Sequence, residues 1–264
     1  MLKEFLNRLL VPLMVRSAHR ERNQHLTVRP EPAPQALPLV VEGLAQGFLK
    51  KNNPALKRIF LARHGESVAN QQKLVSGQLD APLTEKGRNQ AQWLCDVLKN
   101  ETLSAIYTSS LSRTIETAQP TAEYHGIGIQ AVDNLKEIHF GVLQGRPTDG
   151  SDRDAQALWQ AKAADKEAFY IPDSEGNCAF ENRVTECLES VLQDLQDAIL
   201  IVAHRNTNEV ILSKLLGFGS SADKVINVKN KYLYEIELSD TPSINTIRLG
   251  GEFHGKKYVG LKDE

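Results

Sequence analysis

Short apolar runs alternate with amphipathic segments along most of this chain, and this alternation constrains the fold more than any other feature. The clearest apolar run is AILIVA, residues 198–203. Its length and its branched aliphatic residues predict a buried strand. Apolar residues at helical spacing between Phe180 and Leu195 predict a helix before this strand, and residues 206–216 predict another directly after it. Such strand–helix alternation is typical of a mostly parallel sheet covered by helices.

The same pattern continues through the rest of the chain. Further strands are expected at residues 59–62, 105–108, 127–132 and 231–238. Further helices are expected after the N-cap residue Thr84, between Ser109 and Gly126 with a disturbance at Pro120, and around Trp159. We therefore predict the α/β class, as a three-layer α/β/α sandwich with a mostly parallel central sheet.

The chain divides by composition near residue 55. Its start, MLKEFLNRLLVPLMVRSAHRER, is amphipathic and rich in arginine, and RPEPAPQALP follows as a proline-rich linker. The start could be a targeting segment, a surface-binding helix or an extension without either role, and the sequence leaves these alternatives open. We predict an N-terminal extension with a linker over residues 1–55 and one domain over residues 56–264.

Bulk composition excludes several classes of function. The formal net charge is −2, which argues against a general nucleic-acid binder. The sequence contains no apolar run of about 18 residues, so we expect no membrane span. Three cysteines without the spacing of a zinc site or a disulfide framework predict reduced thiols in a cytoplasmic protein. The oligomeric state is not predicted by any of these features.

Cationic side chains follow three of the predicted strands. Arg63 and His64 follow the strand at 59–62, His204 and Arg205 follow the strand at 198–203, and Arg113 comes shortly after the strand at 105–108. Ligands of parallel sheets gather beyond the carboxyl ends of the strands, so neighbouring strands would bring these cations together. Clustered cations are stable only around an anion, and the arginine fork matches a tetrahedral phosphate. The sequence therefore predicts phosphate chemistry on a small phosphorylated metabolite.

The residues of this cluster also suggest the type of reaction. We find neither a Walker-type loop nor a carboxylate cluster for two metal ions, so we expect no metal and no cofactor. A histidine can itself be the nucleophile if it is neutral, and the charges of Arg63 and Arg113 would keep His64 neutral. The leaving oxygen needs a proton, and Glu137 in LKEIHFGVLQGR, with apolar Leu135 and Ile138 close in sequence, is the candidate acid. We expect it to stay protonated beside a bound phosphate.

Five ordered segments carry a resemblance to a known family: LARHGESVAN, SGQLDAPLTEKGRNQA, YTSSLSRTIETA, LKEIHFGVLQGR and LIVAHRNTNEVILSKLLG. Together they resemble the histidine phosphatase superfamily, also called phosphoglycerate mutase-like, over roughly residues 57–238. The resemblance implies that His64 accepts the phosphoryl group and that Arg63, Arg113 and His204 complete the phosphate pocket. It also implies that Glu137 is the proton donor and then the base that activates water.

The resemblance further implies a set of substrate-binding residues. Asn70 matches the asparagine that follows the RHG triplet and touches the phosphate, and Gly77 and Gln78 lie in the loop that borders the substrate. Asn206 matches an asparagine of the mutase branch. Arg205 departs from the family pattern, because glycine usually follows the second histidine. Arg205 could alter the backbone near the site, bind a second anionic group of the substrate, or point into solvent.

Two alternatives to a phosphatase stay open on sequence alone. Residues 137 and 204 are 67 positions apart (204 − 137), which is short for the cofactor-dependent phosphoglycerate mutases and favours the phosphatase branch. We therefore expect a metal-independent phosphomonoester hydrolase that works through phosphohistidine. A mutase, or a catalytically silent module that binds phosphorylated ligands, remains the alternative.

Overall fold

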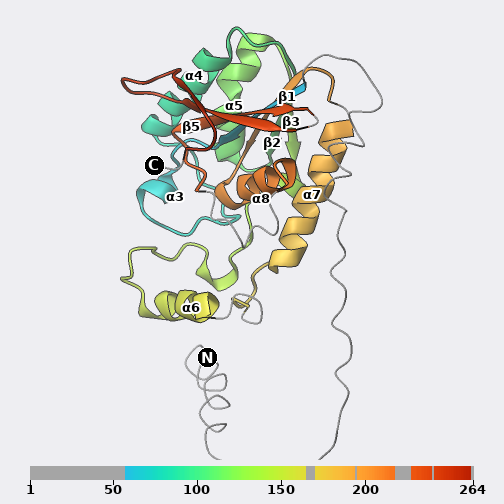
Figure 1. Ribbon diagram of the computed structural model, residues 1–264. Helices are drawn as coiled ribbons and strands as arrows, with labels where there is room; N and C mark the ends of the chain where they lie inside the picture. The colour runs from blue at the N-terminus through green and yellow to red at the C-terminus, as the bar shows by residue number, and fades with distance from the viewer. Residues whose placement is uncertain (1–56, 165–169, 194, 218–226, 240, 263–264) are drawn as a thin grey trace, which may run out of the picture. The chain divides into compact units, whose positions relative to one another are not determined.

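A seven-stranded sheet lies at the centre of the described part of the chain (Figure 1). The computed structural model describes residues 57–164, 170–193, 195–217, 227–239 and 241–262. The strand order is β3-β2-β4-β1-β5-β6-β7. The strands are β1 Lys57–Arg63, β2 Leu103–Ser109, β3 Ile129–Val132, β4 Ala198–Ala203, β5 Tyr232–Leu238, β6 Ser243–Arg248 and β7 Lys257–Val259. The predicted extension and linker over residues 1–55, with their boundary, lie outside the described residues.

The sheet is mostly parallel, as predicted. Strands β3, β2, β4 and β1 pair in parallel, whereas β5, β6 and β7 continue the sheet by antiparallel pairing. Because β6 is antiparallel to β5, which is antiparallel to β1, β6 points the same way as the four parallel strands. The carboxyl ends of β2, β4 and β1 therefore lie side by side at one edge of the sheet.

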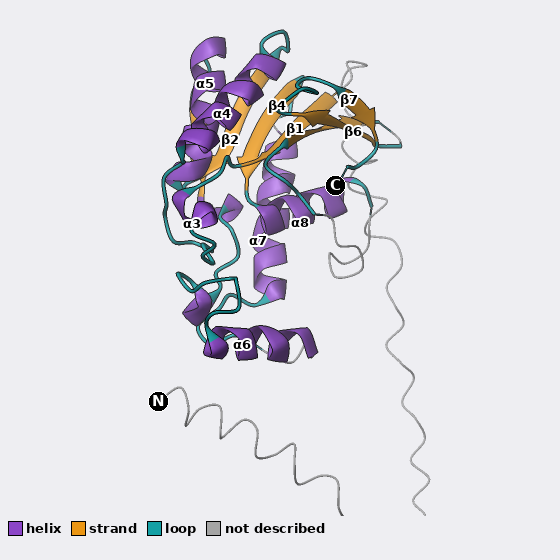
Figure 2. Cartoon of the chain, turned by 90° about the vertical axis from the view of Figure 1, so that its left-hand side faces the viewer, coloured by secondary structure: helices purple, strands orange, loops and turns teal. Residues whose placement is uncertain are grey.

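Helices cover both faces of this sheet and complete the predicted three-layer α/β/α sandwich (Figure 2). One face carries α4 and α5, which pack on Phe60, Ala62 and Leu200. The other carries α7 and α8, which pack on Ile59, Leu61 and neighbouring residues of β4. The helices are α3 Val68–Gln71, α4 Glu85–Leu98, α5 Ser112–His125, α6 Arg153–Ala164, α7 Asn177–Gln193 and α8 Arg205–Leu215, with 3-10 turns η1 Asp133–Leu135 and η2 Gly141–Leu143.

A small lobe packs separately from the sheet. Its apolar cluster consists of Val75, Leu143, Ala155, Leu158 and Ile171. These residues come from the loop after α3, from η2, from α6 and from the segment before α7. Figures 1 and 2 both place α6 apart from the sheet. The loop after α3 therefore belongs to this lobe.

One expectation about the elements differs from the structure, and two strands were not expected. Helix α5 runs unbroken through Pro120, so the predicted disturbance is wrong. Buried Ala118, Thr121 and Ala122 hold the helix in place, and this packing outweighs the one backbone hydrogen bond that a proline removes. The end of α5 at left-handed Gly126 and the N-cap at Thr84, which accepts the N–H of Gly87, are as predicted. Strands β6 and β7 were not predicted.

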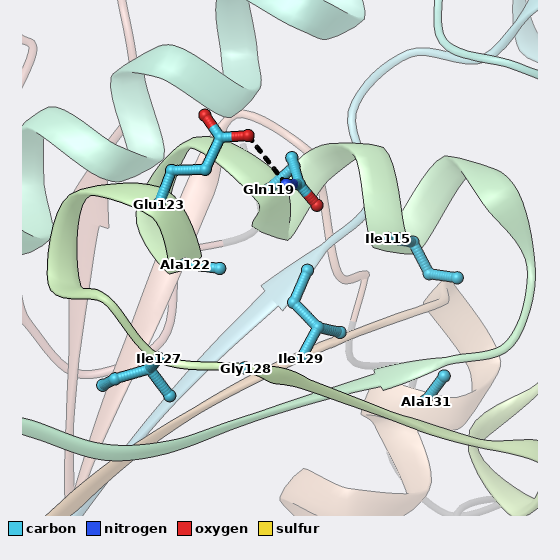
Figure 3. A pocket seen from close by; sticks show the side chains of 8 residues that line it. All are labelled: Ile115, Gln119, Ala122, Glu123, Ile127, Gly128, Ile129 and Ala131. Carbon is cyan, nitrogen blue, oxygen red and sulfur yellow. Dashed lines mark hydrogen bonds between the residues drawn. The ribbon is translucent and has the colours of Figure 1, made fainter.

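Two further features concern surfaces and membranes. A groove between α5 and β3 is lined by Ile115, Gln119, Ala122, Glu123, Ile127, Gly128, Ile129 and Ala131 (Figure 3). It contains none of the predicted site residues. Among the described residues, no helix is both long enough and apolar enough to cross a bilayer.

Candidate active site

The cationic strand ends do meet, because β4 lies between β1 and β2. Arg63 stands opposite Ala203 across the β1–β4 pair, and Thr108 stands opposite Val202 across the β2–β4 pair. The next residues of β1 and β4 are the two histidines, and the ring centroids of His64 and His204 are 5.2 Å apart. Both side chains are buried. The predicted convergence of strand ends is confirmed.

The turn after β1 is held by two neighbouring helices. The N–H of Gly65 donates to Thr117 Oγ1 at 2.9 Å, and the N–H of Glu66 donates to Gln90 Oε1 at 2.7 Å. A Cβ atom on Gly65 would lie 2.6 Å from the Gly87 carbonyl oxygen, closer than real Cβ contacts. Two glycines therefore allow α4 to approach the turn, and α4 and α5 together fix the backbone that carries His64.

The hydrogen bond of His64 defines its nucleophilic atom. Its Nδ1 lies 2.7 Å from the carbonyl oxygen of Gly65, which can only accept, so Nδ1 carries the proton. Burial lowers the pKa of His64 well below its usual value, and the charges of Arg113 and Arg63 lower it further. The ring is therefore neutral at physiological pH, and Nε2 presents a lone pair.

His204 offers a second ring nitrogen to the site. Its Nε2 lies 2.7 Å from Ser109 Oγ, while its buried Nδ1 has no hydrogen-bond partner among the described residues. Burial lowers the pKa of His204 well below the usual value, and the charge of Arg113 lowers it further. If the Ser109 hydroxyl donates to Nε2, the Nδ1–H of the neutral ring remains available to an anion.

Two arginines next to the histidines also hold unused donors. Arg113 is 1% exposed and donates to the carbonyl oxygens of Leu79 and Gly77 at 2.8 and 2.7 Å. Arg63 donates to the carbonyl oxygen of Val228 at 3.3 Å. The Nε of each arginine is buried and has no partner among the described residues. Burial lowers the pKa of Arg113 to about 10 and also lowers the pKa of Arg63. Both side chains are charged, because a guanidinium group does not lose its proton in proteins.

Glu137 lies at the N-terminus of α8. Its Oε2 accepts the backbone N–H of Asn206 at 3.3 Å, and its Oε1 accepts that of Ile138 at 2.9 Å. The side chain is 7% exposed. The charge of Glu137 acts on both Arg63 and Arg113, which places the carboxyl group beside the cation cluster. A general acid at this position would face the leaving group of a bound phosphate ester.

The other predicted substrate residues each make a different kind of contact within the protein. Gln78 donates through Nε2 to the carbonyl oxygen of Glu137 at 3.0 Å, so the loop that contains Gly77 is tied both to the acid and to Arg113. Asn70 forms a capping box with Ser67 at the start of α3. Asn206 takes part through its backbone N–H. That these residues contact a bound phosphate stays a prediction.

Arg205 is exposed at the first turn of α8. Its Nε pairs with Glu209 Oε1 at 3.1 Å, and its side chain is 45% exposed. Burial lowers the pKa of Arg63, and the positive charge of Arg205 lowers it further, so Arg205 acts electrostatically on the site. Burial raises the pKa of Glu209 against the opposing charge of Arg205. Glu209 was not anticipated from the sequence.

Four further residues at the site escaped the sequence analysis: Thr117, Gln144, Glu175 and Arg183. Gln144 Oε1 accepts the N–H of Gln78 at 2.8 Å, and its Nε2 lies 3.1 Å from His139 Nε2. Arg183 and Glu175 contact each other, Arg183 donates to the backbone oxygen of Glu137, and Glu175 accepts the backbone N–H of His139. The bonds from Gln144 to Gln78 and from Arg183 to Glu137 join residues that are 66 and 46 positions apart. A charged Arg183 within the amphipathic pattern of α7 was the available signal.

Comparison with known proteins agrees with this geometry. The sequence model of the histidine phosphatase superfamily (branch 1) matches residues 59–245, which is well over half of the chain. The chain belongs to the histidine phosphatase superfamily. It is thus an enzyme of the phosphatase type, with the phosphoglycerate mutase-like fold expected from its sequence.

The similar proteins described next share less than a third of their residues with this chain. A protein of Yersinia pestis named "Probable phosphoglycerate mutase GpmB" is 29% identical over 186 residues, which cover 70% of this chain and 86% of that protein. The alpha-ribazole phosphatase structure from Shigella flexneri has a TM-score of 0.64 at 26% identity, and the match covers 78% of this chain and 99% of that one. A mycobacterial glucosyl-3-phosphoglycerate phosphatase structure has a TM-score of 0.60 at 22% identity, covers 79% and 99%, and supports the fold.

Proposed function

We propose that the protein hydrolyses small phosphomonoesters through a phosphohistidine on His64. The observation that supports this most directly is a set of buried donors that have no partner within the described part of the chain, Arg63 Nε, Arg113 Nε and His204 Nδ1, near a neutral imidazole. An unpaired buried donor costs about 1–3 kcal/mol, and a phosphate group would satisfy all three. Such an arrangement favours a bound phosphate.

The proposed reaction has two steps. His64 Nε2 attacks phosphorus in line, the bond from phosphorus to the ester oxygen breaks, and Glu137 protonates the departing alcohol. Water then attacks the phosphohistidine, Glu137 takes a proton from this water, and the P–N bond breaks to release phosphate and free His64. Arg63, Arg113 and His204 stabilise the charge on the phosphoryl oxygens in both steps.

Hydrolysis of p-nitrophenyl phosphate tests this proposal. Wild-type protein should release p-nitrophenol, orthovanadate should inhibit it, and His64→Ala should abolish turnover. Glu137→Gln should change the pH–rate profile, and an unchanged profile would remove Glu137 from its proposed role. Absence of turnover across a broad phosphomonoester panel would favour the silent binding module instead. Activity should survive EDTA, because no step uses a metal.

A second candidate is a phosphoglycerate mutase, which the name of the Yersinia relatives favours. A mutase passes the phosphoryl group from phosphohistidine to a second hydroxyl group instead of water. Conversion of 3-phosphoglycerate to 2-phosphoglycerate that depends on bisphosphoglycerate would support it. Release of inorganic phosphate without that conversion would support the hydrolase.

The natural substrate remains to be chosen among phosphorylated metabolites. The Shigella neighbour is named an alpha-ribazole phosphatase, so an alpha-ribazole phosphate belongs in the substrate panel beside sugar phosphates and phosphoglycerates. Asn70, Gly77, Gln78, Arg205 and Asn206 are our candidates for substrate contacts. A cytoplasmic location is also part of this proposal, and cell fractionation would test it.

A further inference from the structure

Arg183 on α7 uses every N–H group that it has. Its guanidinium group has five N–H donors, and it makes five hydrogen bonds at 2.6 to 3.0 Å. Two of these bonds form a bidentate pair with Glu175, whose side chain is 17% exposed beside the 18% of Arg183. Unlike Arg63 and Arg113, Arg183 has no donor left for a ligand.

The three remaining bonds of Arg183 all go to the backbone segment that carries Glu137. They end on the carbonyl oxygens of Asn134, Lys136 and Glu137 at 2.8, 2.9 and 3.0 Å. The segment contains a single short 3-10 turn, η1, followed by an extended residue, so its own hydrogen bonds fix it weakly. Arg183 therefore supplies the rigidity that regular structure does not.

The carbonyl oxygen of Glu137 is also where the substrate loop is attached. It accepts Gln78 Nε2 at 3.0 Å as well as Arg183 Nη2 at 3.0 Å. From the other side, the carboxylate of Glu175 accepts the backbone N–H of His139 at 3.3 Å. Arg183 and Glu175 thus form hydrogen bonds with the backbone on both sides of Glu137, whose side chain is proposed to carry the proton.

We propose that Arg183 and Glu175 are positioning residues that hold Glu137 at proton-transfer distance from the leaving oxygen. This inference rests on the proposed function, since it concerns the acid of that reaction. A displacement of the acid by 1 Å can cost about 10²-fold in rate. Loss of the pair should therefore lower kcat/KM, which reports the first step, only for substrates whose leaving group needs a proton, whereas the second step is common to all substrates and affects kcat.

Leaving-group dependence provides a test that a purely structural role would not pass. The p-nitrophenolate ion leaves without protonation, whereas an alkoxide such as that of glycerol 1-phosphate does not. Arg183→Lys keeps the charge but loses the fork. We expect it to lower kcat/KM about 30-fold for the alkyl ester and less than about threefold for the aryl ester, since a positioned acid contributes about 10²–10⁴-fold. Glu175→Gln should show the same bias if Arg183→Lys folds poorly.

Arg146 provides a matched control. Its bidentate pair with Asp152 has 26% and 20% exposed side chains, close to the Arg183–Glu175 values, but neither side chain contacts the Glu137 segment in the described structure. Arg146→Lys should keep the wild-type ratio of aryl to alkyl activity. In a Glu137→Gln background, Arg183→Lys should cause little further loss on the alkyl ester, because the two residues act as one unit.

The outcomes separate this inference from the proposed function. If the wild type hydrolyses both esters and Arg183→Lys and Glu175→Gln reduce both activities equally, the positioning role is wrong while the hydrolase stands. Full additivity with Glu137→Gln would also overturn it. If the wild type hydrolyses neither ester, the proposed function fails, and the inference fails with it.

Discussion

The arginine side chains of the site differ in how completely their N–H groups are used. Arg183 is saturated by acceptors of the protein, whereas Arg63 and Arg113 keep a buried Nε without a partner among the described residues. A saturated guanidinium group stabilises the fold around it, and an unsaturated one is left to bind an anion. This difference separates the proposed positioning residue from the proposed phosphate ligands.

Because the two histidines are buried, we predict that the free energy of unfolding falls in acid. In the unfolded chain each imidazole titrates near 6.5, whereas burial holds the pKa of His64 and His204 well below that value in the folded state. Below pH 6.5 the unfolded state therefore binds protons that the folded state does not. The free energy of unfolding should fall by up to about 1.4 kcal/mol per pH unit for each histidine, until the folded-state pKa is reached.

Urea unfolding of the wild type and of His204→Gln between pH 5 and 6.5 measures this effect. The variant lacks one of the two titrating groups, so its stability should depend less steeply on pH by about 1.4 kcal/mol per unit. From about one pH unit above 6.5 both histidines are neutral in both states, and their contribution to the slope should vanish. Identical slopes in the two proteins would contradict the buried, neutral state of His204.

Arg205 predicts a preference for substrates with a second negative charge. Its exposed guanidinium group lies close enough to Arg63 to act on it, and its partner Glu209 lies one helical turn away. Arg205→Ala should lower kcat/KM for 3-phosphoglycerate about tenfold, the loss expected for one charge-assisted hydrogen bond of about 1.4 kcal/mol, and leave phenyl phosphate nearly unchanged.

Glu209→Gln is the complementary variant. It removes the carboxylate that holds Arg205 and should raise kcat/KM for the same anionic substrate. Equal effects of both variants on 3-phosphoglycerate and on phenyl phosphate would place Arg205 in solvent, which is the third alternative that its position in the sequence left open.

At the scale of elements, the contact between α4 and the turn after β1 depends on two glycines. A Cβ on Gly87 would lie 2.1 Å from the backbone oxygen of Glu66, so one of the two backbones would have to move. The turn includes the residue after His64 and is bonded to Thr117 and Gln90. Helix packing and nucleophile geometry are therefore coupled through this contact.

Gly87→Ala should lower both stability and turnover. We expect about 1–3 kcal/mol of destabilisation, typical of overpacking, and a larger relative loss of kcat than Gly128→Ala causes. Gly128 lines the groove beside β3 (Figure 3). A Cβ on Gly128 would meet nothing within 4 Å, so Gly128→Ala is the control. Thermal unfolding and p-nitrophenyl phosphate hydrolysis measure both quantities. Wild-type activity in Gly87→Ala would show that the turn tolerates the shift.

The strongly patterned elements were predictable from the sequence, and the weakly patterned ones were not. AILIVA forms β4 over the predicted residues, because a six-residue buried run in a parallel sheet has no other place to bury its side chains. Strand β6, SINTIR, is two-thirds polar and gains its place by antiparallel pairing with β5, a partner that no local signal reveals. Pro120 misled the prediction because tertiary packing outweighed a local propensity.

At the scale of the whole molecule, the proposed phosphate site draws on the sheet, on both helical layers and on the separate lobe. The histidines and arginines were predictable as a group because they follow predicted strands of a parallel sheet, whereas the order of those strands comes from the structure. Glu175 and Arg183 were not, since their contact with the Glu137 segment joins residues that are 36 to 49 positions apart. The residues proposed to bind phosphate could be found from local sequence patterns. Glu175 and Arg183 could not, because only the folded chain brings them to the Glu137 segment.

This assembly predicts that a tetrahedral anion stabilises the protein as a whole. Buried donors without partners among the described residues lie at the ends of β1 and β4 and at the start of α5, and the cations repel one another until an anion binds. Orthovanadate at about 100 times its Kd should add about 2.7 kcal/mol to the free energy of unfolding. For a domain of this size the melting temperature should rise by about 5–10 °C.

Differential scanning fluorimetry with sodium chloride at matched ionic strength separates this effect from screening. Chloride screens surface charges but cannot bridge donors on separate strands, so it should shift the melting temperature far less. A tetrahedral anion satisfies Arg63, Arg113 and His204 at once, and this links β1, α5 and β4. No rise with saturating orthovanadate would mean that the three donors do not share one anion, and the proposed phosphate pocket would then lose its physical basis.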